Sequence, residues 1–228
     1  MTDAVVLSWS GGKDGFIALT TLEADPDITI TALLTTLTDP FERVSMHGTR
    51  EDLLDAQAAA LGLPLAKARL PEKANNVVYR ECFAAALAPF TGNGSEGGLT
   101  AVAFGDLFLA DVREFREAQM RALGLAARFP LWHTPTGTLA RDFIDSGHRA
   151  VVVCVDAEQL APQFLGREYD AAFLADLPQG ADPCGENGEF HSFVYAGPRF
   201  ARPVEFRRGR KVVRDGRFHF LDLERTDA

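Results

Sequence analysis

Three short polar segments carry the residue types that could perform chemistry, and the first is Ser10-Gly11-Gly12-Lys13-Asp14. It follows a short apolar run and precedes a helical pattern. Glycines in such a turn let backbone N–H groups surround an anion, and a helix start adds about half a positive charge. With the hydroxyl of Ser10 and the ammonium of Lys13, the turn is expected to hold two phosphates. The alternative is an ordinary glycine turn between a strand and a helix.

The second segment is Gly105-Asp106, at the end of a later apolar run. In doubly wound sheets, ligands bind at the carboxyl ends of strands, where the strand order reverses. Asp106 is expected there to bind Mg²⁺ on ATP phosphates, together with Asp14, or to orient a nucleophile. The alternative is that the pair only caps the following helix.

The third segment, residues 182–193 (DPCGENGEFHSF), holds Glu186, Glu189 and His191 among several glycines. It is too rich in glycine for a helix and indicates a shaped loop, where polar residues bind more often than they pack. The two glutamates and the histidine are candidates for acid–base catalysis or for binding an acceptor. The alternative is a surface turn with a hydrogen-bonded histidine. Cys184 has no partner cysteine and is not expected to be a nucleophile.

Alternating strand and helix patterns must position these segments. The apolar runs predict strands over 4–9, 28–37, 65–70, 99–104, 126–132 and 150–155, with helical patterns between them. Crossovers of a dozen or more residues predict an α/β fold with a doubly wound parallel sheet. A strand order of 3-2-1-4-5 would place the first turn beside Asp106.

The pattern changes after about residue 156, where shorter strands and a hairpin over 211–223, turning at Asp215-Gly216, are predicted. We therefore expect an ATP-binding domain over residues 1–135 and a smaller C-terminal α+β domain over 136–228. Residues 39–45, just before His47, are expected to form a mobile loop that closes over nucleotide, with helix entry as the alternative reading.

The composition of the 228 residues limits the function classes. No apolar run approaches the roughly 20 residues of a bilayer span, and the start lacks the basic region of a signal peptide. Three cysteines without a CxxC pair favour a reducing cytoplasm over disulfides or structural zinc. A formal charge of −9 argues against nucleic acid as the main partner. One basic cluster is expected to be a solvated hairpin face, or else a patch for an acidic partner: Arg207, Arg208, Arg210, Lys211, Arg214 and Arg217.

The first segment resembles the PP-loop, SGGxDS, of the ATP pyrophosphatase (adenine nucleotide alpha hydrolase-like) superfamily, whose fold is Rossmann-like. It is neither a P-loop nor a dinucleotide turn, because its spacing differs from both. The resemblance implies that the turn holds the β,γ-pyrophosphate of ATP as a leaving group. Gly15 stands where serine is usual, so one hydroxyl contact is absent and a backbone N–H is expected to replace it in part.

The third segment resembles the signature loop of the diphthine–ammonia ligase family, a GEGGEYHT-like string followed by Gly-Pro, here Gly197-Pro198. Asn187 and Ser192 replace the usual glycine and threonine, in a form similar to the bacterial branch. The resemblance runs from Val5 to about Pro198. Further matches occur in the same order: Met46-His47, Ala60-Leu61-Gly62-Leu63-Pro64, Gly105-Asp106 and Pro130-Leu131-Trp132.

The resemblance implies an ATP- and Mg²⁺-dependent ligase that adenylates a carboxylate acceptor, releases pyrophosphate and AMP, and uses ammonia or an amine as nucleophile. Eukaryotic and archaeal members amidate diphthine on elongation factor 2; the acceptor of this chain is not implied. Two alternatives remain: an adenine-nucleotide-binding module without catalysis, and a PP-loop thiolation enzyme, against which the acidic balance and the lone Cys184 argue. A homodimer is possible, but nothing in the sequence indicates an oligomeric state.

Overall fold

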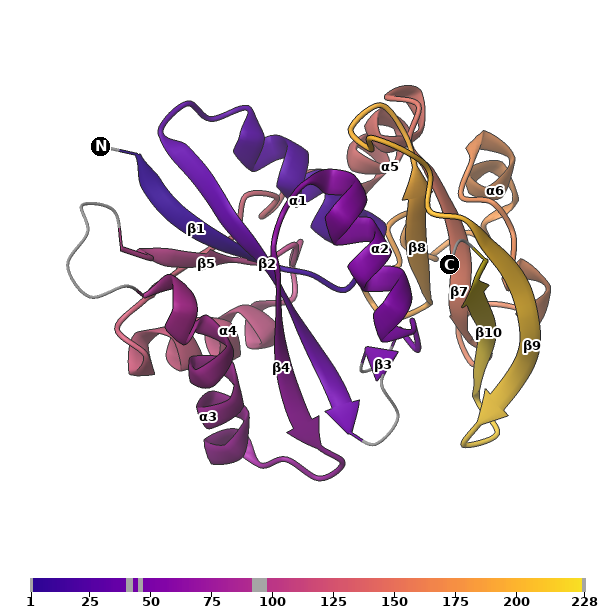
Figure 1. The fold of residues 1–228 in the computed structure, drawn as a ribbon. Helices are drawn as coiled ribbons and strands as arrows, with labels where there is room; N and C mark the ends of the chain where they lie inside the picture. The colour runs from indigo at the N-terminus through magenta and orange to yellow at the C-terminus, as the bar shows by residue number, and fades with distance from the viewer. Residues whose placement is uncertain (1, 40–42, 45–46, 92–97, 227–228) are drawn as a thin grey trace.

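The computed structural model describes residues 2–39, 43–44, 47–91 and 98–226, and its first part is built on a six-stranded sheet (Figure 1). The central strand β1 pairs in parallel with β2 on one side and with β5 on the other. Strand β4 lies beyond β2 and β6 beyond β5, again in parallel. The strands are β1 (Asp3–Ser8), β2 (Ile28–Asp39), β3 (Arg43–Val44), β4 (Leu65–Pro71), β5 (Ala101–Ala103) and β6 (Ala126–Arg128).

This arrangement confirms the predicted doubly wound parallel sheet and its strand order. One strand was not predicted: β3 pairs antiparallel with the last residues of β2, beyond the point where β1 ends. It falls in the segment 39–45 that was expected to be a loop. Residues 40–42 and 45 of that segment, and Met46 of the family motif, lie outside the described residues.

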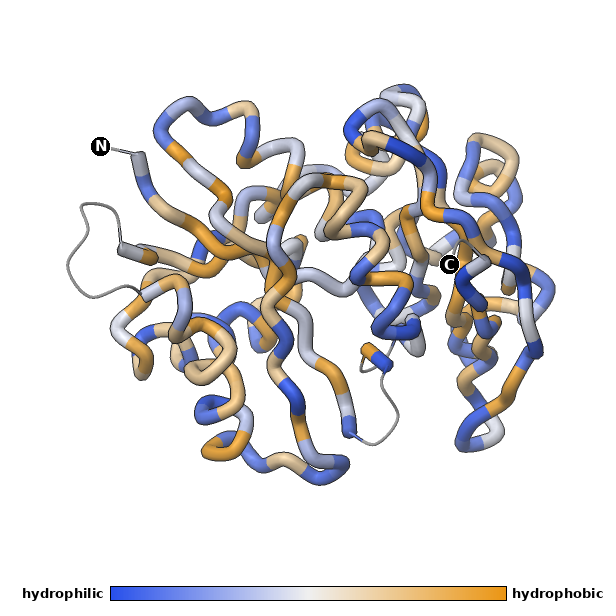
Figure 2. The backbone as a smooth tube through the Cα atoms, viewed as in Figure 1, coloured by the Kyte–Doolittle hydropathy of each residue, from blue (hydrophilic) through white to orange (hydrophobic). Residues whose placement is uncertain are grey.

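Helices cover both faces of the sheet, because β1 presents alternate residues to two cores. Val5 and Leu7 pack with the helices on one face, and Val6 packs with those on the other. The helices α1 (Lys13–Glu23) and α2 (Glu51–Leu61) belong to the first core, and α3 (Asn76–Leu87) and α4 (Ala110–Ala122) to the second. The central strands are largely hydrophobic in Figure 2, as strands buried on both faces must be.

A second, four-stranded sheet has the order β8-β7-β10-β9 and is antiparallel throughout. The apolar run 150–155 was grouped with the parallel strands, and that grouping was wrong: the run forms most of β7, inside this second sheet. A strand buried on both faces has the same apolar pattern in either kind of sheet, so composition alone did not separate them. The elements are α5 (Thr136–Asp145), β7 (Arg149–Asp156), α6 (Ala171–Asp176), β8 (Phe190–Ala196), β9 (Phe206–Arg214) and β10 (Phe218–Arg225).

The predicted hairpin is present as β9 and β10, which turn at Asp215 and Gly216 with φ of +53° and +65°. One continuous hydrophobic core joins the two sheets through α1, α2 and α5. The domain boundary at residues 135 and 136 stays a prediction. Among the described helices, none combines the length and apolar character needed to cross a membrane.

Candidate active site

The glycine turn (residues 10–12) leaves the carboxyl end of β1 and leads into α1. Gly11 has a φ of +83°, and a Cβ there would lie 2.7 Å from Leu54 Cδ2 and 2.8 Å from Gln57 Oε1. A Cβ at Gly12 would lie 3.1 Å from the carbonyl oxygen of Ser192. Gly11 therefore needs glycine, and a side chain at position 12 would require the Ser192 carbonyl to shift by a few tenths of an ångström. The amides of Gly12 and Lys13 donate to Ser10 Oγ, at 3.4 Å, and Ser192 Oγ, at 3.2 Å. The following amides of α1 receive no side-chain cap, and such groups at a helix start can bind an anion.

Lys13 lies at the start of α1 with 1% of its surface exposed. Its Nζ donates to both carboxylate oxygens of Asp14, at 3.0 and 2.9 Å, and to the carbonyl oxygen of Cys184. The ammonium also lies over the rings of Tyr169 and Phe190, 5.5 and 5.3 Å from their centroids. Burial acts to lower the pKa of the Lys13 ammonium, but the nearby Asp14 and Cys184 outweigh it and the pKa is raised. The Lys13 side chain therefore connects the glycine turn to the second sheet.

The acidic loop (residues 182–191) is organised by its own carboxylates. Asp182 Oδ1 accepts hydrogen bonds from the amides of Cys184, at 2.9 Å, and Glu186, at 3.2 Å. Glu189, 3% exposed, accepts from the Asp182 amide at 2.8 Å and from Asn187 Nδ2 at 3.0 Å. The loop contains no helix, in agreement with its glycine content. Glu189 therefore shapes the loop from within.

The glycine turn and β8 are joined by backbone and side-chain hydrogen bonds. The Val194 amide donates to the carbonyl of Gly11 at 2.9 Å. Gln57 of α2, fully buried, donates from Nε2 to the carbonyls of Gly11, at 3.0 Å, and Val194, at 2.5 Å. Its Oε1 accepts from Trp9 Nε1 at 3.0 Å. Sequence reasoning missed Gln57, because a glutamine in an amphipathic helix resembles any solvent-facing polar residue.

These elements enclose a cleft of about 230 Å³ at the carboxyl ends of β1 and β5. Seven of the predicted site residues line it: Ser10, Asp14, Gly15, Gly105, Asp106, Glu186 and His191. His47 and Arg116, which were not among the predicted site residues, also line it. Gly11, Gly12, Lys13 and Glu189 do not line the cleft and lie in the structure around it.

Glu186 reaches the cleft from the acidic loop and binds the segment after β5. Its Oε1 accepts from the amides of Leu107, at 2.7 Å, and Phe108, at 3.3 Å. Burial raises the pKa of Glu186 to about 7, the Leu107 amide opposes this, and the negative charge of Asp14 adds to it. At neutral pH both protonation states of Glu186 are therefore populated, as a proton acceptor requires.

Asp106 and Arg116 face each other across the cleft wall. Burial raises the pKa of Asp106, although the charge of Arg116 opposes the shift. Asp106 Oδ2 is buried and has no hydrogen-bond partner among the described residues, and Arg116 Nε lies 3.6 Å away. Arg116 also donates to Tyr79 Oη at 3.3 Å and lies over the ring of Phe104, 4.9 Å from its centroid. The sequence did not predict Arg116 as a site residue, because an arginine on an amphipathic helix is usually exposed to solvent.

His47 and His191 stack in the cleft with centroids 4.3 Å apart and planes inclined by 28°. Burial lowers the pKa of His191 to about 4, with a further contribution from the charge of Lys13. Burial, followed by the neighbouring His191, lowers the pKa of His47 well below its ordinary value. Both rings are therefore neutral at pH 7 and can each donate and accept a hydrogen bond.

Two further glycines differ in what they require. A Cβ at Gly105 would lie 2.9 Å from the carbonyl carbon of Asp14, so glycine lets the end of β5 approach α1 closely. A Cβ at Gly15 would lie 3.6 Å from Trp9 Cε3, an ordinary contact. A serine at position 15 would therefore fit, and the departure from SGGxDS is not forced by packing.

The carboxylates of the cleft suit a magnesium ion that shares its ligands with phosphate. Asp106 Oδ2 is buried and accepts no hydrogen bond from the described residues, although Arg116 forms an ion pair with it at 3.6 Å. Asp14 lines the same cleft, and both of its carboxylate oxygens accept from Lys13. Within the described part of the chain, no group of three or more histidine, cysteine, aspartate or glutamate residues could hold a metal. Mg²⁺ is typically held by one or two carboxylates together with substrate phosphates and water, so a site for it in this cleft would need the phosphates of ATP.

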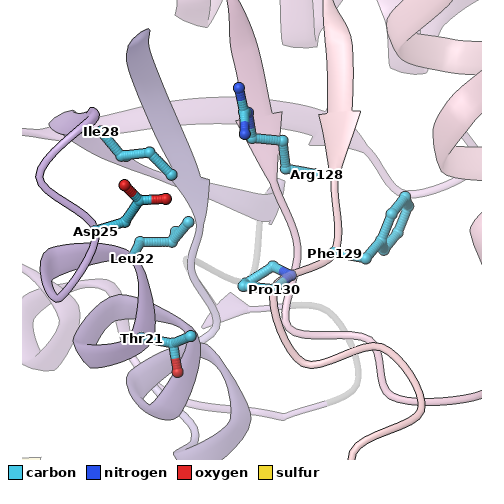
Figure 3. Close-up of a pocket in the computed structure, with 7 residues that line it drawn as sticks. All are labelled: Thr21, Leu22, Asp25, Ile28, Arg128, Phe129 and Pro130. Carbon is cyan, nitrogen blue, oxygen red and sulfur yellow. The ribbon is translucent and has the colours of Figure 1, made fainter. Parts of the chain in front are cut away.

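A second hollow of about 360 Å³ lies between the end of α1 and the segment after β6 (Figure 3). It contains none of the predicted site residues. Asp25 and Arg128 provide its charged groups, and Arg128 pairs with Asp3. Because α1 has 11 residues, at about 1.5 Å per residue, this hollow lies roughly a helix length from the glycine turn.

The fold and the cleft define the class of protein. It is a doubly wound α/β domain with a glycine turn after its first strand, and a loop from a second, antiparallel sheet completes the cleft beside that turn. The chain belongs to the diphthamide synthase family, since family models described as the diphthamide synthase N-terminal and C-terminal domains match residues 2–126 and 135–227. This confirms the resemblance to the diphthine–ammonia ligase family and indicates a function of that kind. No curated protein matches the chain. Its place in a bacterial branch stays a prediction.

Proposed function

We propose that this protein is an ATP-dependent ligase that adenylates a carboxylate acceptor and then forms an amide with ammonia or an amine. One observation carries the proposal: residues from three segments far apart in the sequence line a single cleft at the carboxyl ends of β1 and β5. They are Ser10, Asp14, Gly15, Gly105, Asp106, Gly185, Glu186 and His191. Ligands of doubly wound sheets bind at this edge. Membership of the diphthamide synthase family supports the same reaction type.

In the first step, Ser10 and the backbone amides of Asp14 and Gly15 at the start of α1, which line the cleft, hold the two outer phosphates of ATP. A carboxylate oxygen of the acceptor attacks the α-phosphorus, the bond from that phosphorus to the oxygen bridging to the β-phosphate breaks, and pyrophosphate leaves. Mg²⁺ bound with ATP by Asp14 and Asp106 would neutralise the phosphate charge. Amides fixed before the reaction stabilise the developing charge without reorganisation.

In the second step, the nitrogen nucleophile attacks the acyl carbon, and the bond between that carbon and the oxygen of AMP breaks. The nitrogen must lose a proton as the amide forms. Glu186 is placed to accept this proton, because its pKa of about 7 leaves much of it ionised at neutral pH. The neutral ring of His191 offers a hydrogen bond to the acceptor in the same cleft.

Lys13 was expected to grip phosphate directly, and its contacts support a different role. Its ammonium is held by Asp14 and by the carbonyl of Cys184, so we assign it to fixing the acidic loop against the glycine turn. The phosphate contacts are then made by Ser10 and by the amides of Asp14 and Gly15.

The test is to incubate the protein with ATP, Mg²⁺, ammonium and a panel of carboxylates and carboxylate-bearing peptides, and to measure pyrophosphate. We expect release above the acceptor-free rate with a subset of the panel, and a loss on the order of 10²-fold in Asp106→Asn. Asp111→Asn, an exposed aspartate on α4, serves as the matched control and should keep the parent rate. Tight ATP binding without pyrophosphate release across the whole panel would support the non-catalytic nucleotide-binding alternative.

A further inference from the structure

One side of α4, with its N-cap residue, lines the cleft with two apolar side chains and one cation. Leu109, Val112 and Arg116 follow one another at spacings of three and four residues, so they lie on the same side of the helix. Among the described residues that line the cleft, Arg116 is the one lysine or arginine. Three carboxylates line the same cleft, so an anionic ligand depends on this guanidinium for electrostatic attraction.

The guanidinium of Arg116 is oriented mainly by uncharged groups. It lies over the ring of Phe104, 4.9 Å from the centroid, and donates to Tyr79 Oη at 3.3 Å. Its Nε is buried and makes no hydrogen bond within the described residues, and the ion pair from this atom to Asp106 Oδ2 is long, at 3.6 Å. A guanidinium has five N–H donors, so Arg116 offers a ligand a fixed plane with donors to spare.

The cleft extends from one face of the parallel sheet to the other. Asp14 and Gly15 lie at the start of α1, which packs in the first hydrophobic core, whereas Phe104 packs with α4 in the second. When a nucleophile displaces a group from phosphorus, the attacking and leaving oxygens lie roughly in line. Because the proposed reaction expels pyrophosphate at the α1 end, the acceptor must approach from the α4 end, where Arg116 lies.

We propose that Arg116 binds the carboxylate of the acceptor and that Leu109 and Val112 contact the carbon skeleton next to it. The acceptor would then be an acid whose carboxylate is attached to an apolar segment. This inference rests on the proposed function. A planar guanidinium matches a carboxylate in a forked geometry, and the carboxylate keeps further lone pairs with which to attack phosphorus. Leu109 and Val112 are both partly exposed, as contact with a ligand requires.

The test measures binding of hexanoate, and of hexanamide as its uncharged counterpart, by isothermal titration calorimetry without ATP. We expect the parent protein to bind hexanoate more tightly than either hexanamide or acetate. Arg116→Gln should weaken hexanoate binding by about tenfold or more, because the charged hydrogen bonds are lost, and should change the Kd for ATP by less than about threefold. Arg121→Gln removes an exposed arginine of the same helix and is the matched control, expected to change both constants by less than about twofold.

Arg116→Lys keeps the positive charge without the forked donors, so it should weaken hexanoate binding by about threefold or more. This variant decides the outcome if circular dichroism shows that Arg116→Gln does not fold. Hexanoate affinity equal to that of the parent in a folded Arg116 variant, or no hexanoate binding by the parent, would overturn the proposal. A Kd for ATP that rises about tenfold while hexanoate binding persists would assign Arg116 to a phosphate of ATP instead.

The hexanoate titration contains no ATP, so its outcome is separate from that of the ligase assay. Binding of hexanoate through Arg116, with no pyrophosphate release from any carboxylate of the panel, would contradict only the proposed function. Pyrophosphate release at the parent rate in Arg116→Gln, at an acceptor concentration below saturation, would contradict only the role of Arg116.

Discussion

Lys13 shows how a single buried charge can connect two parts of the proposed active site. Desolvation of an ammonium is costly unless partners surround it, and here a carboxylate and a carbonyl do so. The carbonyl belongs to Cys184 of the acidic loop, two residues before Glu186. The position of Glu186, the proposed proton acceptor, therefore depends on the lysine, even though the lysine does not line the cleft.

Replacing Lys13 with methionine should separate a positioning role from a phosphate contact. We expect amide formation to fall on the order of 10²-fold, because the acidic loop loses its anchor, while the Kd for ATP changes by less than about threefold. Equilibrium binding and pyrophosphate release measure the two quantities, and amide hydrogen exchange at residues 184–186 reports the loosened loop. A Kd that rises in step with the loss of rate would return Lys13 to the role of a phosphate ligand.

Glu186 should make stability depend on pH in a defined direction. Its pKa rises from an ordinary 4.5 to about 7, so between these values the native state binds a proton that the unfolded chain has released. Its contribution to the free energy of unfolding is therefore largest below pH 4.5, falls as pH rises toward 7, and is constant above.

Urea unfolding of the parent and of Glu186→Gln, from pH 5 to pH 8, checks this dependence. The difference between the two free energies should decline toward pH 7 and then level off. The neutral histidines act in the opposite direction in both proteins, and their effect cancels in the difference. A flat difference over the whole range would show that the carboxyl group is not perturbed.

At the scale of elements, Gln57 joins three parts of the fold: α2, the glycine turn and β8. Its side chain serves two carbonyls and one indole N–H in a fully buried place. Leaving buried polar groups without partners costs about 1–3 kcal/mol each. The hydrogen bonds of this one residue therefore fix how the turn and the strand meet.

Gln57→Met should lower the free energy of unfolding by roughly 2–4 kcal/mol, as measured by urea denaturation. Gln119→Met is the matched control, because Gln119 is 5% exposed and its Oε1 has no partner among the described residues. That variant should change stability by less than about 1 kcal/mol. Similar losses in both variants would mean that packing, rather than the junction, accounts for the effect.

Much of this arrangement was predictable from the sequence, for reasons that particular elements show. The alternation of strands and helices, with Ser10 at the end of the first strand, predicted the parallel sheet and its strand order. In that order β1 and β5 are neighbours, so Asp106, which follows β5, lies near the turn that follows β1. The directions of side chains were not predictable. Glu186 and Glu189 belong to the same loop and are the same residue type, yet Glu186 lines the cleft and Glu189 lies inside the loop. Strand β7 was assigned to the wrong sheet because hydrophobic pattern carries no information on strand direction.

At the scale of the whole molecule, the two sheets share one hydrophobic core. Leu53 and Leu54 of α2, fully buried, belong to the same cluster as Val151 of β7 and Phe193 of β8. Removal of the second sheet would expose this apolar surface of the first. Apolar surface contributes about 25 cal/mol per Å² when buried, so the loss would be large relative to a typical domain stability.

We therefore expect the full chain to unfold in one cooperative transition, with coincident near- and far-ultraviolet circular dichroism curves. A fragment ending at residue 135 should lack a cooperative transition and should bind a hydrophobic dye. Two separate transitions in the full chain, or native-like unfolding of the fragment, would show that the sheets are independent.

The hydrogen bond from the Val194 amide to the Gly11 carbonyl has a consequence for recombination between relatives. A chimaera that took its first 126 residues from one relative and the remainder from another would have to reproduce this junction. The junction includes the Gln57 side chain, which donates to the carbonyls of both Gly11 and Val194. Exchange of acceptor preference by swapping halves should therefore succeed only when the residues at positions 11, 57 and 194 are inherited as a set.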